Sequence, residues 1–200
     1  MSLIEELKRV LGDQNVLTGT DKERYSSDWL GQYRFEPLCV VRPASTEEVS
    51  KVVRLAGSFN VNIVPVGGNT GLNGGTHSDN AISISMERMN KICEIRLNSK
   101  IAIVEAGLIL ANLHQIVNEN DLMFPLTFGA RGSATIGGVL STNAGGSNVL
   151  KYGNTRDLVL GVEIVLPSGE IMNLMSELHK DNSGYCLRAV SYTHLRAHET

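Results

Sequence analysis

The sequence is poor in several features that mark common functional classes. Its 200 residues carry a formal net charge of −3, and lysine and arginine form no basic stretch. Binding to a nucleic-acid backbone normally requires a basic excess or stripe, so no nucleic-acid partner is expected. No apolar run approaches the roughly 18 residues typical of a membrane-spanning helix, so no transmembrane segment is expected.

Cysteine is also scarce. Cys39, Cys93 and Cys186 are widely spaced and form no Cys-x-x-Cys pair. This spacing favours neither a disulfide framework nor a zinc site, and we expect buried free thiols. Residues 1–11 alternate charged and apolar residues at helical spacing, unlike the continuous apolar core of a signal peptide. We therefore expect a soluble protein of a reducing compartment, the cytoplasm, with no metal site in this chain.

Two familiar phosphate-binding motifs are missing, because the sequence has no Gly-Lys dipeptide and no Gly-x-Gly-x-x-Gly spacing. In their place, the apolar run Val61–Val66 leads into Pro65–Gly75, an uncharged stretch with five glycines. Glycine lets backbone N–H groups converge on one point, which makes an anion site that needs no basic side chain. Each hydrogen bond to a charged group contributes roughly 1.5 to 3 kcal/mol, so a few amides suffice for a diphosphate. A flexible linker is the alternative interpretation.

A second glycine-rich stretch, residues 129–146, makes the linker interpretation less attractive for the first. It contains six glycines and places hydroxyl residues ahead of the apolar pair Val139-Leu140. The small residues Thr135–Gly138 are typical of a helix N-terminus, where free amides and the helix dipole favour an anion. The two stretches together predict a phosphate-bearing ligand.

The hydrophobic periodicity predicts an α+β fold. Apolar residues recur at helical spacing over residues 3–11, 46–59 and 108–120, and Ser45 and Glu48 have the spacing of a capping box before the second helix. The expected buried faces of these helices are Ile4, Leu7 and Leu11; Val49, Val52, Val53, Ala56 and Phe59; and Ile109, Leu113, Ile116 and Val117. Strands are predicted at 61–66, 81–85, 91–97, 101–105, 159–166 and 171–174.

Some single residues allow two interpretations. The aromatic segment Asp21–Leu38, which includes Trp29, is expected to be a packed loop, with contact to a planar ligand as the alternative. His114 lies beside an apolar helical stripe, which favours a structural histidine over a catalytic one. Arg156-Asp157 is expected to be an ordinary ion pair, and a ligand role for Arg156 is the alternative.

These motifs together resemble the FAD-binding domain of the vanillyl-alcohol oxidase/PCMH flavoprotein superfamily. Within it the sequence is most similar to the FAD-linked D-2-hydroxyacid dehydrogenases, among them D-lactate, D-2-hydroxyglutarate and glycolate-oxidising enzymes. The resemblance covers roughly residues 25–188 and rests on five blocks in the same order, at 41–49, 65–75, 134–146, 152–157 and 180–185.

The resemblance implies a two-lobed PCMH-type FAD-binding domain over residues 25–188, preceded by an N-terminal helical segment, 1–24. Lobe one would cover about 40–106 and lobe two about 107–188, with an extended FAD held between them. Residues 189–200 resemble translated adapter sequence and are expected to be non-native, so the domain is expected to be incomplete at its C-terminus. His194 and His198 have metal-ligand spacing, but their place in this tail argues against a metal site.

The resemblance also implies which residues bind the cofactor. Backbone amides of the first loop would meet the diphosphate, namely those of Gly67, Gly68, Asn69, Thr70, Gly71 and Leu72. A second set would run along the other side of FAD, namely Pro125, Gly132, Ser133, Thr135, Ile136, Gly137 and Gly138. A third set would pack near the flavin or adenosine portion, namely Asn143, Ala144, Gly145 and Gly146. Relatives that attach flavin covalently often use a histidine of the first loop. Asparagine and threonine stand there in this sequence, so noncovalent FAD is expected, although His77 keeps covalent attachment open.

The family's reaction is hydride transfer from the hydroxyl-bearing carbon of a D-2-hydroxyacid to flavin N5. In that branch the acid/base histidine, the divalent-metal ligands and the carboxylate-binding arginine belong to a C-terminal domain, so this chain is expected to hold no catalytic residue and to be inactive alone. An NADPH-dependent enolpyruvyl reductase of cell-wall synthesis and a non-catalytic flavin-holding electron-transfer subunit are the alternatives. The sequence does not distinguish the hydroxyacid, the electron acceptor or the oligomeric state.

Overall fold

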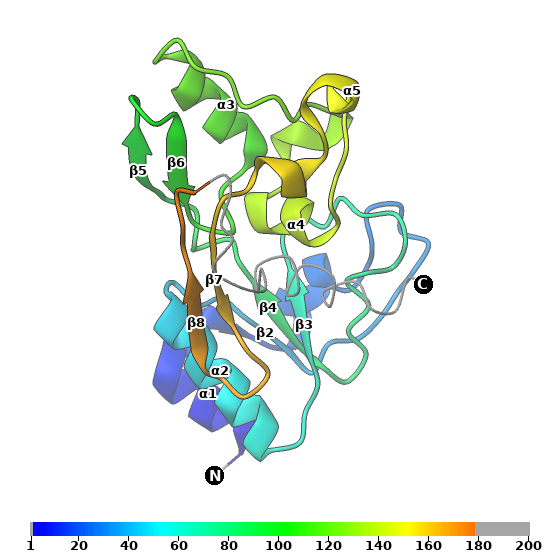
Figure 1. Ribbon diagram of the computed structural model, residues 1–200. Helices are drawn as coiled ribbons and strands as arrows, with labels where there is room; N and C mark the ends of the chain where they lie inside the picture. The colour runs from blue at the N-terminus through cyan, green and yellow to red at the C-terminus, as the bar shows by residue number, and fades with distance from the viewer. Residues whose placement is uncertain (1, 179–200) are drawn as a thin grey trace. The chain divides into compact units, whose positions relative to one another are not determined.

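The computed structural model describes residues 2–178 (Figure 1). By their contacts, the described residues divide into two compact units. The first comprises the chain up to Met89 together with Val165–Met172, and the second comprises Asn90–Ile164 with the described residues from Asn173 onward. Each unit combines helices with strands, so the α+β prediction is confirmed. The domain boundaries drawn from the sequence stay predictions, and the block 180–185, Cys186 and residues 189–200 lie outside the described residues.

A four-stranded sheet forms the centre of the first unit, in the order β1-β2-β4-β3. Its strands are β1 (Val16–Leu17), β2 (Cys39–Val41), β3 (Ile63–Val66) and β4 (Ile82–Ser85). β1 is antiparallel to β2, whereas β2 and β3 both run parallel to β4. Every residue of β2 and β4 is buried, as is typical of parallel strands covered on both faces. The strands predicted at 61–66 and 81–85 are confirmed, while β1 and β2 were not predicted.

Two amphipathic helices pack their apolar faces into the same core as this sheet, α1 (Leu3–Leu11) and α2 (Thr46–Ser58). In α1, Leu7 is fully buried, and Ser2 and Glu5 form a capping box. The capping box predicted for α2 is only half right. The Ser45 hydroxyl accepts from the Glu48 amide at 3.3 Å, but the Glu48 carboxylate accepts from the Ala44 amide at 2.7 Å, one residue before the expected partner.

Phe59 was predicted on the buried face of this helix, and that prediction is wrong. The residue is 40% exposed, since it follows the last helical residue and its backbone, at φ −97° and ψ 3°, leaves the helical path. Two 3-10 helices, η1 (Asp13–Asn15) and the longer η2 (Gly19–Tyr25), complete the N-terminal part.

The second unit contains the antiparallel hairpin of β5 (Ile92–Arg96) and β6 (Ile101–Val104), followed by α3 (Leu110–Asn118). The predicted hairpin and helix are confirmed. The buried face of the helix differs from the prediction, because Leu110 is fully buried whereas Ile109 and Ile116 are only partly buried. Smaller elements follow along the chain, namely η3 (Gly129–Gly132), α4 (Ile136–Ser141), α5 (Val149–Tyr152) and η4 (Thr155–Leu158). A core of Leu110, Leu126, Ala134 and Val139 joins α3 to α4.

A second hairpin consists of β7 (Val162–Val165) and β8 (Ile171–Leu174). Its turn belongs to the first unit, where the buried Ser50 hydroxyl of α2 donates to the Gly169 carbonyl at 2.5 Å. The predicted return strand is confirmed, while β7 is shorter than the predicted 159–166.

Candidate cofactor site

The first glycine loop begins where β3 ends at Val66 and turns on Asn69, whose φ of +49° lies in the left-handed region. Asparagine tolerates this region better than most residues with a side chain. The Asn69 amide group is held at both ends, because its nitrogen donates to the Ser27 carbonyl at 2.8 Å and its oxygen accepts from the Thr76 hydroxyl at 2.8 Å. The loop therefore has a defined shape and is not a linker without structure.

The backbone amides of this loop are available to a ligand. Within the described part of the chain, no amide from Gly68 to Gly75 donates a hydrogen bond to a protein acceptor. A Cβ built on Gly71 or Gly75 would meet nothing within 4 Å, so these residues border open space. Uncommitted N–H donors beside open space suit a diphosphate, which offers only acceptor oxygens, so the residues present fit the phosphate part of FAD.

The aromatic segment that precedes β2 packs against this loop. The Tyr33 ring lies 3.5 Å from the position of a Cβ on Gly74, and the rings of Phe35 and His77 are 5.3 Å apart. Phe35 is buried, as a packed loop requires, whereas Trp29 is 59% exposed. His77 is exposed and its Nε2 lies 3.2 Å from the Asp79 carboxylate. Sequence reasoning missed Ser27, Tyr33 and Thr76 as neighbours of the loop, because nothing in their spacing indicates these contacts.

The second glycine stretch begins α4, with the Thr135 hydroxyl accepting from the Gly138 amide at 3.3 Å as the N-cap. The predicted helix start is confirmed, but the prediction that its amides are free is wrong. The Ile136 amide donates to the Leu108 carbonyl at 2.9 Å, and the Gly137 amide donates to the Ala106 carbonyl at 2.7 Å. These bonds hold the start of α4 against the chain before α3.

The end of the second stretch offers a different set of donors. Asn143, like Asn69, has a φ of +49°, and its side-chain oxygen accepts from the Arg156 amide at 3.1 Å. The chain passes so close to Thr127 that a Cβ on Gly146 would overlap the Thr127 carbonyl oxygen. Among the described residues, no protein acceptor is bonded to the amides of Gly145 and Gly146. In the second unit, uncommitted donors thus lie at 145–146 and not at the start of α4.

Arg156 does not form the ion pair with Asp157 that the sequence suggested. Its guanidinium donates to the carbonyls of Leu140 and Ser141, at 3.4 and 3.0 Å, where the negative end of the α4 dipole attracts a cation. The Asp157 carboxylate instead accepts from the Asn154 amide at 2.8 Å and caps η4. Arg156 thereby stabilises the segment that carries Asn143.

The remaining predicted cofactor residues lie in the same two stretches. Gly67, Thr70 and Leu72 belong to the first loop, and Leu72 is 55% exposed. In the second unit, the Pro125 carbonyl accepts from the Asn148 side chain at 2.9 Å, Ser133 follows η3, and Gly132 is exposed. The structure thus brings each set together within its own unit.

The thiols differ from the expectation that all are buried. Burial raises the pKa of the Cys39 thiol to about 11, whereas Cys93 is exposed. In the described range, no three histidine, cysteine, aspartate or glutamate side chains lie close enough to hold a metal ion. The His114 and Phe124 rings lie 6.3 Å apart with a tilt of 42° between their planes, and the buried Nε2 of His114 has no hydrogen-bond partner among the described residues.

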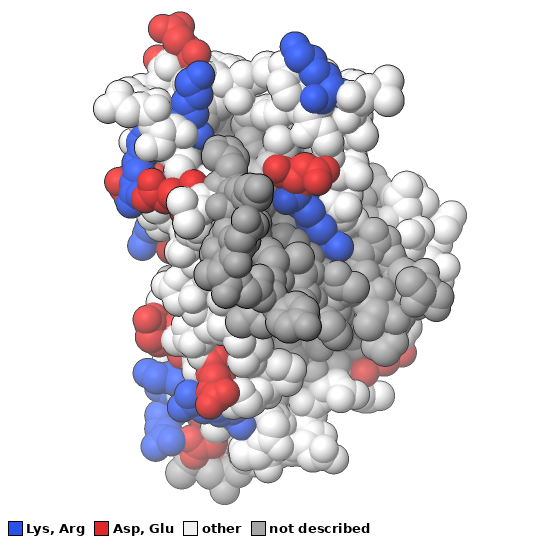
Figure 2. All heavy atoms as spheres, viewed as in Figure 1, with Lys and Arg blue, Asp and Glu red and all other residues white. Residues whose placement is uncertain are grey.

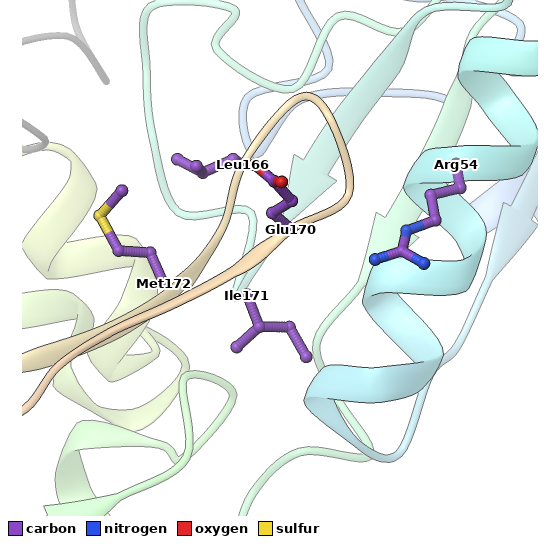
Figure 3. A pocket seen from close by; sticks show the side chains of 5 residues that line it. All are labelled: Arg54, Leu166, Glu170, Ile171 and Met172. Atoms are coloured by element: carbon purple, nitrogen blue, oxygen red, sulfur yellow. The ribbon is translucent and has the colours of Figure 1, made fainter.

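A hollow of about 480 Å³ lies between α2 and the β7–β8 turn (Figure 3). Arg54 extends from α2, while Leu166, Glu170 and Ile171 come from the hairpin. It contains no residue of either glycine stretch, so it is not the phosphate site. Figure 2 shows, among the described residues of one face, basic and acidic side chains interspersed in small groups without a basic stripe.

Comparisons with known proteins agree with this chemistry. The FAD binding domain family matches residues 37–175. The chain is 43% identical over 169 residues to the D-2-hydroxyglutarate dehydrogenase of Xanthomonas citri pv. viticola, covering 84% of the chain and 36% of that protein. It is 37% identical over 189 residues to the mitochondrial D-2-hydroxyglutarate dehydrogenase of Arabidopsis thaliana, covering 92% of the chain and 34% of that protein. The chain thus spans about a third of the length of these relatives.

Solved structures show the same fold. An alkyldihydroxyacetonephosphate synthase superposes with a TM-score of 0.82 at 23% identity, over 94% of this chain and 36% of that one. The 6-hydroxy-D-nicotine oxidase of Arthrobacter nicotinovorans superposes with a TM-score of 0.71 at 25% identity, over 80% and 35%. No helix between residues 2 and 178 is long and apolar enough to cross a membrane. With a glycine loop of uncommitted amides and a family match over most of its length, this chain belongs to the FAD binding domain family.

Proposed function

We propose that the chain is the FAD-binding part of a flavoenzyme that oxidises a D-2-hydroxyacid, with D-2-hydroxyglutarate as the first candidate. The observation that carries the proposal is the loop 68–75, whose amides lack protein acceptors among the described residues, in a member of an FAD binding family. The substrate class is supported by 43% identity to a D-2-hydroxyglutarate dehydrogenase.

The three predicted sets of cofactor residues are part of this proposal. The amides of Gly68–Leu72 would bind the diphosphate, and those of Gly145 and Gly146 would bind a second polar part of the cofactor. In the stretch Thr135–Gly138, whose first amides are engaged, side chains and surface shape would contribute in place of free donors. Noncovalent attachment is supported by Asn69 and Thr70, because the first loop has no histidine to form a covalent link to the flavin.

Bound FAD supplies the acceptor for the hydride that leaves the hydroxyl-bearing carbon of the substrate. The residues of this chain would bind and orient the cofactor, and the only charged side chain in the two glycine stretches is that of Arg131, whose guanidinium donates hydrogen bonds and accepts no proton. The base that takes the hydroxyl proton is therefore proposed to lie in a part of the complete protein that corresponds to the unmatched part of the longer relatives.

The test is a titration of the 200-residue chain and of the complete gene product with FAD, followed by desalting and absorption spectroscopy. We expect the complete protein to retain flavin and D-2-hydroxyglutarate to bleach its absorption near 450 nm, while the 200-residue chain shows no bleaching. Bleaching by NADPH and not by the hydroxyacid would favour an enolpyruvyl reductase. A flavin that responds to neither donor would favour an electron-transfer subunit.

We also propose a cytoplasmic location, supported by three cysteines without a paired spacing. Relatives from rice and Arabidopsis carry the word mitochondrial in their names, so cell fractionation of the source organism decides the point. The partner proposed for the longer protein is a small hydroxyacid.

A further inference from the structure

The glycine loop is held in shape by one side chain. Asn69 lies seven residues before Thr76, and the hydrogen bond between their side chains closes the loop into a ring. The second bond of Asn69 joins this ring to Ser27, a residue 42 positions earlier in the chain. Since the amides from Gly68 to Gly75 make no bond to the described protein, few other interactions resist deformation of the loop.

The direction of both hydrogen bonds follows from their chemistry. The Ser27 carbonyl can only accept, so it must face the Asn69 nitrogen. The Asn69 oxygen is then the group that faces Thr76, whose hydroxyl donates to it. A side chain at position 69 without both a donor and an acceptor cannot satisfy both neighbours.

We propose that Thr76 is a positioning residue for the cofactor: through Asn69 it holds the loop 68–75 in its phosphate-binding shape before the ligand arrives. This proposal rests on the proposed FAD site. Holding a loop in its bound shape strengthens binding because less conformational freedom is lost when the ligand enters. The Tyr33 ring, 3.5 Å from the position that a Cβ on Gly74 would take, lies beside the same end of the loop.

The test compares Thr76→Val, which keeps the shape and removes the hydroxyl, with Thr76→Ser, which keeps the donor. Thr20→Val is the matched control, because Thr20 is exposed and its side-chain hydroxyl makes no hydrogen bond to any described residue. The first readout needs no flavin: thermolysin cleavage at the Gly71–Leu72 bond, followed by mass spectrometry, reports local opening beside the exposed Leu72. The second is the dissociation constant for FAD of the complete protein.

We expect Thr76→Val to raise both the cleavage rate and the FAD dissociation constant by about five- to tenfold. Thr76→Ser and Thr20→Val should stay within about twofold of the wild type. Asn69→Gly keeps a residue that tolerates positive φ but removes the bonds to both Thr76 and Ser27, so its effect should be at least as large as that of Thr76→Val without added backbone strain.

Unchanged cleavage in Thr76→Val would overturn the proposal, and so would faster cleavage with unchanged affinity for FAD. A fall in melting temperature as large in Thr20→Val as in Thr76→Val would do the same, because it would mark a general effect on folding. If the wild-type complete protein fails to bind FAD, the proposed function fails, whereas the cleavage rates still decide whether Thr76 holds the loop.

Discussion

At the scale of single residues, two asparagines combine a left-handed backbone conformation with a side-chain hydrogen bond to another segment. Asn69 and Asn143 share a φ of +49°, and each uses its side-chain oxygen to fix a neighbouring segment. The sequence indicated both loops through their glycines. It did not indicate these bonds, because Ser27 and Arg156 are 42 and 13 residues away from their partners.

Gly146→Ala should destabilise the protein by about 1 to 3 kcal/mol, because the added methyl group would overlap the Thr127 carbonyl and force the chain apart. Gly129→Ala is the control, since a Cβ there meets nothing within 4 Å. Urea unfolding of both variants measures the difference. Equal stabilities would show that the close approach at Gly146 is not maintained in solution.

The two described cysteines should differ sharply in reactivity. At pH 8 the Cys39 thiol, with its pKa raised to about 11 by burial, should resist iodoacetamide, while the exposed Cys93 should react. Peptide mass spectrometry of the native protein distinguishes the sites, and denatured protein supplies the fully alkylated reference. Modification of Cys39 at the rate of Cys93 would contradict its burial.

At the scale of elements, the β7–β8 turn is attached to α2 by the Ser50 hydroxyl, which donates to the Gly169 carbonyl. Ser50→Ala should cost about 1 to 3 kcal/mol, because the buried carbonyl would lose its partner. Ser58→Ala, at the exposed end of the same helix, should have little effect because its bond to the Leu55 carbonyl is local. Denaturant midpoints of the two variants decide whether the turn depends on this contact.

The carboxylate of Glu87, two residues after the end of β4, accepts hydrogen bonds from Tyr25 of η2 and from Arg42, the residue that follows β2. Burial disfavours the charge on Glu87, but hydrogen bonds from Tyr25 and Arg42 and the charges of Arg24 and Arg42 outweigh it, so its pKa is lowered. A carboxyl group with a lowered pKa stabilises the fold above its unfolded pKa of about 4.3, and this contribution is lost as the pH falls through the lower folded value.

Glu87→Gln should therefore lower the melting temperature at pH 7 and flatten its decline below about pH 4.3. Glu23→Gln is the control, because that exposed side chain makes no ion pair with any residue that the structure describes. Melting curves between pH 2.5 and 7 give the comparison. Parallel curves for wild type and Glu87→Gln would mean that the carboxylate contributes nothing to the acid sensitivity.

The elements that the sequence predicted well have a clear period. α1 and α2 show apolar residues at helical spacing, and β5 and β6 flank a short turn. β2 was missed because three consecutive buried residues show no alternation, and α5 because four residues cannot show a helical period. The amides at the start of α4 were misjudged since their acceptors, the carbonyls of Ala106 and Leu108, are about thirty residues away.

At the scale of the whole molecule, the chain combines modest charge with a ligand that is itself anionic. With a net charge of −3 and a first loop without charged residues, the phosphate recognition proposed there would depend on amide dipoles and shape. Local geometry would then replace the basic side chains that many nucleotide sites use, so a composition that argues against a nucleic-acid partner is still compatible with a dinucleotide ligand.

If the uncommitted amides of the first loop bind FAD, the stability of the protein in a cell will depend on the supply of FAD. A ligand that binds only the folded state adds stability that grows with its concentration, about 2.7 kcal/mol at a hundred times its dissociation constant. When riboflavin is short, newly made chains would lack that contribution and would open to proteases more often. The abundance of the protein would then follow the vitamin supply even at constant synthesis.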